Sequence, residues 1–164
     1  MTPEDLVEIE LIKQVKYKYM RCVDQKLWDE IAECFTESAT AAYSGGKYAY
    51  DGRDAIVAFL RKGMSADSFH SSHRVHHPEI ALTGPDSATG IWALEDTVID
   101  TRWQIVISGA AFYTDEYVKQ DGHWLIQHTG YRRSYEQMFS RKDIPSLKLT
   151  ASWWSTDGRS EIDV

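Results

Sequence analysis

The second half of the chain consists of four long runs rich in β-branched and aromatic residues. These runs cover residues 75–83, 88–101, 104–119 and 123–135, and turn sequences such as Gly84-Pro85-Asp86 separate them. β-Branched and aromatic side chains favour strands, whereas Gly, Pro and Asp favour turns. The sequence therefore predicts a sheet of long antiparallel strands, which an all-helical fold could not accommodate.

The first part of the chain has the spacing of amphipathic helices. Apolar residues recur at steps of three and four over residues 3–23, and the same spacing returns over residues 27–35. Pro3 suits a first helical turn, with Thr2 as its N-cap. The pattern predicts a pair of helices with Asp24 at the elbow between them.

A hairpin and a third helix are expected next. Gly45-Gly46 lies between two short tyrosine-bearing runs in residues 39–50, which indicates a hairpin. Asp51 is a candidate cap for a helix that ends near Gly63, and the polar residues 64–72 are expected to form a loop. Helices followed by antiparallel strands predict an α+β domain in which a curved sheet wraps the helices.

The chain length fits one domain. With 164 residues there is room for one substantial core and none for a second. We assign residues 1–142 to this domain. Residues 143–164, which include Trp153 and Trp154, form a tail that fits three interpretations equally: a cover for a pocket, a contact with a neighbouring subunit, or disorder.

Charge and hydropathy restrict the partners. The net charge of −7 argues against nucleic acid, because phosphate binding needs clustered Lys and Arg. No run approaches the roughly 20 apolar residues of a membrane helix, and the first ten residues do not resemble a secretory signal. We therefore expect a cytoplasmic protein with a small-molecule partner and no membrane contact.

One acid lies on an apolar face. In the strand over residues 88–98, alternation places Asp96 on the same side as Trp92 and Leu94. A carboxyl group there must be hydrogen-bonded, paired or protonated, because burying it bare is costly. The alternative is that the strand ends near Glu95 and that Asp96 is solvated.

Four histidines lie within eight residues, at His70, His73, His76 and His77. Imidazole binds zinc, copper and iron, but no thiol or patterned carboxylate completes a ligand set, so we expect no metal. A single histidine that acts as a base is the preferred interpretation, and it needs a carboxylate to orient it. Asp24 could supply that carboxylate, or it could simply end a helix.

Several segments resemble SnoaL-like members of the nuclear-transport-factor-2-like (NTF2-like) superfamily. The segment over residues 16–29 resembles the start of such domains. Further segments resemble, in order, the bacterial bile-acid 7α-dehydratases: residues 43–47, 73–80, 92–96, 109–115 and 129–136. This resemblance implies a cone-shaped α+β barrel, no metal or organic cofactor, and a homotrimer.

The resemblance also implies roles for individual residues. In these dehydratases and in related enzymes a His and an Asp form the catalytic dyad, and by position these are His73 and Asp24. Tyr19, Tyr43, Asp96 and Arg133 match polar residues of the dehydratase site. We expect catalysis from His73, Asp24, Tyr19 and Asp96, and substrate binding by Tyr43, Arg133, Tyr113 and Trp92.

The leading hypothesis is elimination of water from a hydroxylated hydrophobic ring compound such as a 3-oxo steroid. His73 would remove a proton, Asp24 would orient His73, and Tyr19 or Asp96 would donate to the oxygen where charge develops. One alternative is a ketosteroid-type isomerase or polyketide cyclase. Another is a non-catalytic ligand-binding or assembly subunit, for example beside an aromatic-ring oxygenase.

Overall fold

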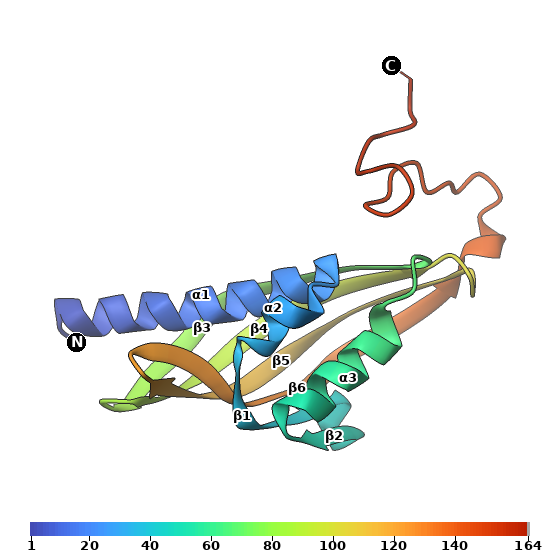
Figure 1. Cartoon of the computed structure of the whole chain (residues 1–164). Coiled ribbons are helices and arrows are strands. Elements are labelled where there is room, and N and C mark those ends of the chain that lie inside the picture. Colours follow the sequence, from blue (N-terminus) through green and yellow to red (C-terminus); the bar gives the residue numbers. More distant parts are fainter. Residues whose placement is uncertain (164) are drawn as a thin grey trace.

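A long helix lies in the hollow of a strongly curved sheet (Figure 1). The computed structural model describes residues 1–163. The elements follow one another as α1 (Pro3–Gln25), α2 (Trp28–Ala32), β1 (Phe35–Tyr43), η1 (Ser44–Gly46), β2 (Tyr48–Asp51), α3 (Arg53–Met64), β3 (Phe69–Gly84), β4 (Ser87–Asp100), β5 (Ile105–Gln120), β6 (His123–Ser140) and η2 (Arg141–Asp143). The predicted α+β class, with helices first and long strands after, is confirmed.

The ends of helix α1 follow from its sequence. Thr2 and Asp5 form a reciprocal capping box at the start, and Pro3 occupies the first turn. Lys26 adopts a left-handed conformation with φ 57° at the other end, which turns the chain towards α2. The buried face of the helix carries Ile12, Lys16, Tyr19, Met20, Cys22 and Val23. A lysine in this set is unexpected, and its partner is described below.

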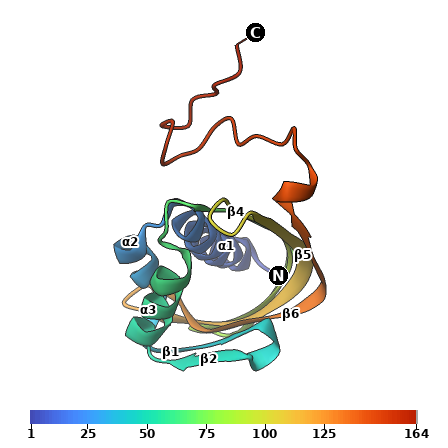
Figure 2. The same ribbon diagram turned by 90° about the vertical axis from the view of Figure 1, so that its right-hand side faces the viewer.

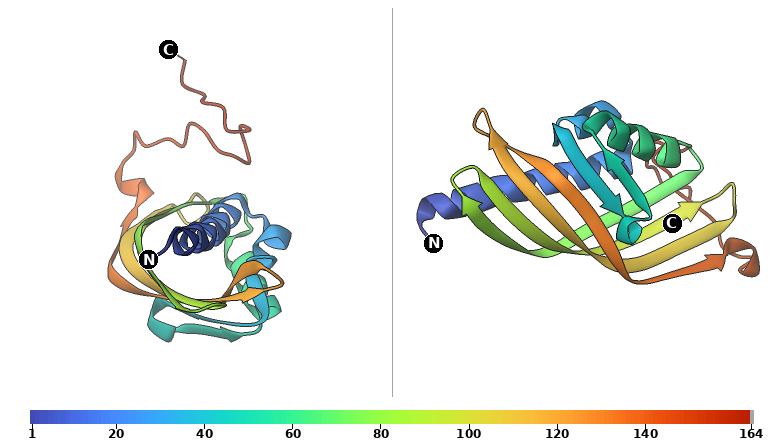
Figure 3. Two further views of the ribbon diagram at one scale, coloured as in Figure 1. Left: turned by 90° about the vertical axis from the view of Figure 1, so that its left-hand side faces the viewer. Right: turned by 90° about the horizontal axis from the view of Figure 1, so that it is seen from below.

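The sheet has the strand order β2-β1-β6-β5-β4-β3. Strands β3 to β6 form an antiparallel meander, whereas β1 pairs with β6 in parallel and joins the first part of the chain to the last strand. Viewed along its length, the sheet curls around α1 without closing, and α2 and α3 cover the gap (Figures 2 and 3). The concave face of the sheet therefore faces the helices.

Three local predictions were wrong. The second helix ends at Ala32 because the chain then pairs with β6, where Cys34 already accepts a hydrogen bond from Ile126. Asp51 is the last residue of β2, and Gly52, with φ 90°, takes the cap position of α3, since that conformation favours glycine. The predicted loop over residues 64–72 is shorter, because β3 begins at Phe69 and pairs with β4.

The tail forms no helix or strand between Ile144 and Asp163, the last residue described. It rises from the end of β6 and passes above the elbow between α1 and α2 (Figures 1 and 2). Trp154 of the tail contacts the domain, with its ring centroid 4.1 Å from Lys26 Nζ. Among the described residues, no helix combines the length and apolar character needed to cross a membrane.

Candidate active site

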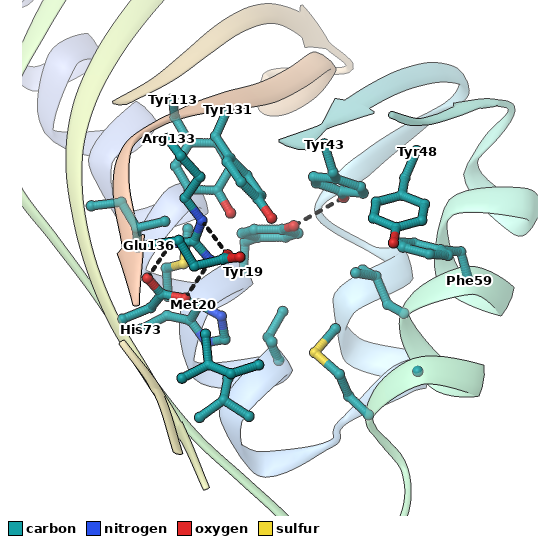
Figure 4. Close-up of a pocket in the computed structure, with 18 of the residues that line it drawn as sticks. Tyr19, Met20, Tyr43, Tyr48, Phe59, His73, Tyr113, Tyr131, Arg133 and Glu136 are labelled. Carbon is teal, nitrogen blue, oxygen red and sulfur yellow. Dashed lines mark hydrogen bonds and ion pairs between the residues drawn. The ribbon is translucent and has the colours of Figure 1, made fainter. Parts of the chain in front are cut away.

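A cavity of about 430 Å³ lies between the concave face of the sheet and helices α1 and α3. Its walls are mostly apolar and aromatic, and the ionisable groups that line it besides tyrosines are His73, Asp96, Arg133 and Glu136. Small-molecule sites have this volume and this mixture of apolar walls with a few polar groups. Figure 4 shows His73, Arg133 and Glu136 on one side and Tyr43, Tyr48 and Phe59 on the other.

His73 and Asp24 form a hydrogen-bonded pair at this cavity. His73 Nδ1 lies 2.7 Å from Asp24 Oδ1, and the backbone N–H of His73 donates to Asp24 Oδ2 at 2.8 Å. Ser71 Oγ donates to Asp24 Oδ1 at 2.8 Å. Three donors therefore fix the carboxylate, and the pair that the sequence suggested is brought together.

The local structure explains why these residues meet. Asp24 lies in the last turn of α1, just before the left-handed residue Lys26. Ser71 and His73 are two residues apart on β3, so alternation points both side chains to the same face. Side-chain exposure is 14% for His73 and 23% for Asp24, so the pair is largely shielded from water, and His73 lines the cavity.

The tautomer of His73 follows from its partner. A carboxylate that already accepts two other hydrogen bonds accepts from Nδ1–H as well, which leaves Nε2 as the basic nitrogen. The ring lines the cavity. The arrangement can therefore take a proton from a bound molecule, while Asp24 stabilises the imidazolium that forms.

Asp96 and Arg133 form a second pair in the cavity wall. The guanidinium of Arg133 donates to both Asp96 oxygens, with Nη2 at 2.9 Å from Oδ2. Arg133 Nε also lies 3.1 Å from Glu136 Oε2, an ion pair without hydrogen-bond geometry. The hydrogen bonds with Asp96 raise the pKa of Arg133.

The bidentate pair bears on the expected role of Asp96. Its two oxygens accept hydrogen bonds from the Arg133 guanidinium, and its role as a donor to the substrate oxygen stays a prediction. The alternative that the strand ends near Glu95 is wrong, because β4 continues to Asp100 and the Asp96 side chain is only 3% exposed. Asp96 holds the guanidinium of Arg133 in the cavity wall.

Gly109 makes room for this pair. It lies opposite Asp96 in the β4–β5 ladder, and a Cβ there would meet Tyr135 O at 2.5 Å and Arg133 Nη1 at 3.1 Å. A side chain at this position would push the guanidinium away from Asp96.

Tyrosine hydroxyl groups supply the other polar atoms of the cavity. Tyr19 Oη and Tyr43 Oη are 3.0 Å apart, so that one donates to the other. Tyr113 and Tyr131 meet edge to face, with ring centroids 5.4 Å apart. Burial raises the pKa of Tyr19, Tyr43 and Tyr113, so these phenols stay protonated and can donate hydrogen bonds near neutral pH.

An aromatic stack forms the wall opposite His73. Phe59 of α3 stacks on Tyr50 at 4.5 Å and on Tyr43 at 5.7 Å between ring centroids, and Tyr48 leans on it at 5.4 Å. Flat aromatic faces of this kind favour contact with a flat or ring-shaped apolar molecule.

Comparison with known families identifies the domain. The profile of the SnoaL-like domain matches residues 4–130, which include α1 and most of the sheet. The chain belongs to the SnoaL-like family.

Solved structures of low sequence identity share the SnoaL-like fold. A candidate scytalone dehydratase from Novosphingobium aromaticivorans is 22% identical, with a TM-score of 0.77 over 98% of this chain and all of that chain. A type 3 hexachlorocyclohexane dehydrochlorinase from Novosphingobium barchaimii is 18% identical, with a TM-score of 0.74 over 82% of this chain and 92% of that chain. A Mycobacterium tuberculosis protein of unknown function is 24% identical, with a TM-score of 0.70 over 92% and 83%. These likenesses confirm the predicted NTF2-like architecture.

Most of the predicted site residues of the SnoaL-like domain line the cavity. They are Tyr19, Tyr43, His73, Asp96, Tyr113 and Arg133, with Asp24 directly behind His73. Trp92 is the exception and corrects the expectation of a substrate contact. It is fully buried, does not line the cavity, and donates from Nε1 to Tyr117 Oη at 3.0 Å.

The side chains of the four neighbouring histidines do not meet at one site. Only His73 of the four lines the cavity. His76 Nε2 lies 3.6 Å from Glu95 Oε2 on the outer side. Within residues 1–163, no three His, Cys, Asp or Glu side chains are placed to hold a metal ion.

Sequence reasoning missed a buried ion pair beneath the cavity of the SnoaL-like domain. Lys16 Nζ lies 2.7 Å from Asp115 Oδ2, and both side chains are completely buried. A signal existed, because Lys16 occupies the helical position between Ile12 and Tyr19 on the apolar face. The aromatic stack around Phe59 was missed as well, since its members come from three separate elements.

Proposed function

We propose that this SnoaL-like protein is a lyase that eliminates water from a hydroxylated hydrophobic ring compound such as a 3-oxo steroid, by general base catalysis. The observation that carries the proposal is the hydrogen bond between His73 Nδ1 and Asp24 Oδ1 at the edge of an apolar cavity. Two of the similar structures bear the names of a dehydratase and a dehydrochlorinase, both of which denote elimination.

The first step is removal of a proton. His73 Nε2 takes a hydrogen from a carbon that a conjugated carbonyl group acidifies, and Asp24 stabilises the imidazolium. A positioned base of this kind contributes about 10²- to 10⁴-fold to the rate. The electron pair of the broken C–H bond moves into the enone, so that negative charge develops on the carbonyl oxygen.

The second step is departure of the hydroxyl group. The charge on the carbonyl oxygen is stabilised by the hydroxyl of Tyr19, which Tyr43 holds at 3.0 Å, and one such donor contributes about 10²- to 10³-fold. The electrons return to form the new double bond as the C–O bond breaks. The imidazolium of His73 returns its proton to the leaving hydroxyl, which departs as water.

The cavity walls support a substrate with fused or aromatic rings. The aromatic stack around Phe59 faces the His73 side across the cavity. Arg133 is already engaged by Asp96 and Glu136, so the lining does not present a free cation. A neutral or weakly polar ring system fits these surfaces better than an anion.

The experiment is turnover of a 7-hydroxy-3-oxo-4-ene steroid followed by mass spectrometry. Parent protein should yield a product lighter by one water, and His73→Ala should lose this activity while it remains folded. His76→Ala is the matched control, because His76 is on the same strand but outside the cavity. Equal turnover by His73→Ala and the parent would refute the mechanism.

A ketosteroid-type isomerase or a polyketide cyclase is the second candidate, because a base beside a hydroxyl donor also serves proton return or ring closure. Isomerisation leaves the mass of the substrate unchanged, so the same assay separates it from dehydration. A homotrimer remains our proposal for the assembly, and light scattering of the purified protein tests it.

A further inference from the structure

We infer that Lys16 and Asp115 act as a pair of positioning residues that fix helix α1 against the sheet and so place Tyr19 and Asp24 in the site. The kinetic and binding consequences rest on the proposed function and its steroid ligand, but the structural consequence does not. Neither residue touches the cavity.

The pair belongs to a fully buried polar network. Asp115 Oδ2 lies 2.7 Å from Lys16 Nζ as an ion pair and accepts from Tyr117 Oη at 2.7 Å, while Oδ1 accepts from Thr129 Oγ1 at 2.7 Å. Lys16 Nζ also lies 3.4 Å from Thr129 Oγ1. Trp92 donates to the Tyr117 hydroxyl and extends the network. The carboxylate thus has two hydroxyl donors and one paired ammonium group, and these contacts fix its orientation.

Stability alone does not explain a buried ion pair. Removing two charges from water costs about as much as their attraction returns, and apolar residues of similar volume often serve equally well. Burial lowers the pKa of Lys16, and the Asp115 carboxylate opposes this effect. What charges and hydrogen bonds add to an apolar interface is a preferred geometry, because contacts between hydrocarbon groups are non-directional.

The position of the pair links it to the site. Tyr19 follows Lys16 by one helical turn, and Asp24 lies further along the same helix. Tyr113 precedes Asp115 by two residues and points to the same face of β5. Lys16 Nζ lies 3.5 Å from the ring centroid of Tyr113 and 5.1 Å from that of Tyr19. One ammonium group therefore contacts the strand residue Asp115 and the rings of two of the cavity tyrosines, Tyr19 and Tyr113.

A small slip of the helix would be enough to disturb the site. One residue corresponds to about 1.5 Å along a helix axis. A shift of that size along the Asp24–His73 direction would lengthen their 2.7 Å contact beyond hydrogen-bond distance. It would also move the Tyr19 hydroxyl away from Tyr43, with which it shares its 3.0 Å hydrogen bond.

The test uses the double variant Lys16→Met, Asp115→Asn, which removes both charges and nearly conserves volume. We expect the variant to fold, with its melting temperature changed by a few degrees at most. Its kcat for the steroid should fall by about 10²-fold, the loss that displacement of a catalytic group by about 1 Å can cause. The Kd for progesterone, a neutral 3-oxo-4-ene steroid, should rise about 10-fold, because Tyr19 no longer meets the carbonyl group.

Lys18→Met is the matched control. Lys18 lies on the same helix, but its pair with Glu33 is at the surface. This variant should keep the kcat and the progesterone affinity of the parent. If the parent protein binds progesterone without turning over a steroid, the proposed function fails while the binding comparison still tests the positioning role.

Two results would overturn the inference. The first is a folded double variant with unchanged Kd and kcat. The second is loss of folding in both the double variant and Asp115→Asn, which conserves shape and can still accept a hydrogen bond; that outcome would make the pair a structural requirement only. A crystal structure of the folded variant should show a longer distance from Asp24 to His73.

Discussion

The Asp24 carboxylate has two possible effects on His73: it orients the ring, and it stabilises the imidazolium. Replacement of Asp24 by Asn separates them, because an amide oxygen can still accept from Nδ1 but carries no charge. Asp24 accepts three hydrogen bonds, from Ser71 Oγ, His73 N and His73 Nδ1. An amide has one oxygen, so its NH₂ group must replace one of these acceptors. The least disruptive orientation keeps the oxygen on Ser71 and His73 Nδ1 and turns NH₂ towards the backbone N–H of His73, donor against donor.

The cost in stability follows from that lost acceptor. A hydrogen bond to a charged group contributes about 1.5–3 kcal/mol when buried. Asp24 is 23% exposed, so the lower end applies, and we expect a loss of about 1–2 kcal/mol. For a domain of this size, this corresponds to a melting temperature lower by roughly 2–8 °C.

The cost in activity should be much larger. Asn carries no charge to stabilise the imidazolium, and it can also favour the wrong tautomer of the ring. In hydrolase triads the same change lowers kcat by about 10⁴-fold, so we expect a fall of about 10²- to 10⁴-fold here. The assay is the rate of water loss from the steroid, measured beside a thermal melt.

The matched control is Asp29→Asn, which changes a fully exposed aspartate on α2 and should leave both quantities unchanged. If Asp24→Asn kept more than about half of the parental kcat while remaining folded, the pairing of Asp24 with His73 would not serve proton transfer. A loss of stability without a loss of rate would assign Asp24 a structural role.

Two further predictions concern the other ionisable groups. Arg133→Met leaves the Asp96 carboxylate buried without its cation, so the free energy of unfolding measured by chemical denaturation should fall by about 3–5 kcal/mol. A second change, Asp96→Asn, should restore part of this loss. An unchanged free energy of unfolding in the single variant would contradict the pairing. Burial raises the pKa of Tyr19, Tyr43 and Tyr113 above the ordinary value of 10.0, so the stability that these phenols contribute is complete below about pH 10 and is lost as the pH rises through their raised pKa values. Their phenolate absorbance should then appear together with loss of the near-ultraviolet circular dichroism signal, and ionisation of all tyrosines in a folded protein would contradict this prediction.

The predictable parts of the fold depended on local patterns. Alternation along residues 88–98 indicated that Asp96 faces inward, and helical spacing placed Asp24 at the end of α1. The dyad itself came from a family resemblance, since nothing in the spacing of Asp24 and His73 shows that they meet. Elements far apart in sequence come together through the sheet order, which no local pattern encodes.

The errors have a common physical cause. The helical spacing of residues 27–35 and the capping tendency of Asp51 are local preferences, and pairing between strands overrides both. Trp92 and Asp96 share one face of β4, yet only Asp96 lines the cavity. The face of a strand can be inferred from its sequence, but the depth at which each residue lies depends on how the whole sheet curves.

The parallel pairing of β1 with β6 has a consequence for how the protein is made. Phe35 pairs with Ile126, so β1 must wait for the last strand before its backbone groups on that side find partners. Contacts between such distant segments form slowly. A nascent chain that still lacks β6 also lacks Tyr131 and Arg133, which line the cavity. The cavity is thus complete only after nearly the whole chain has been synthesised.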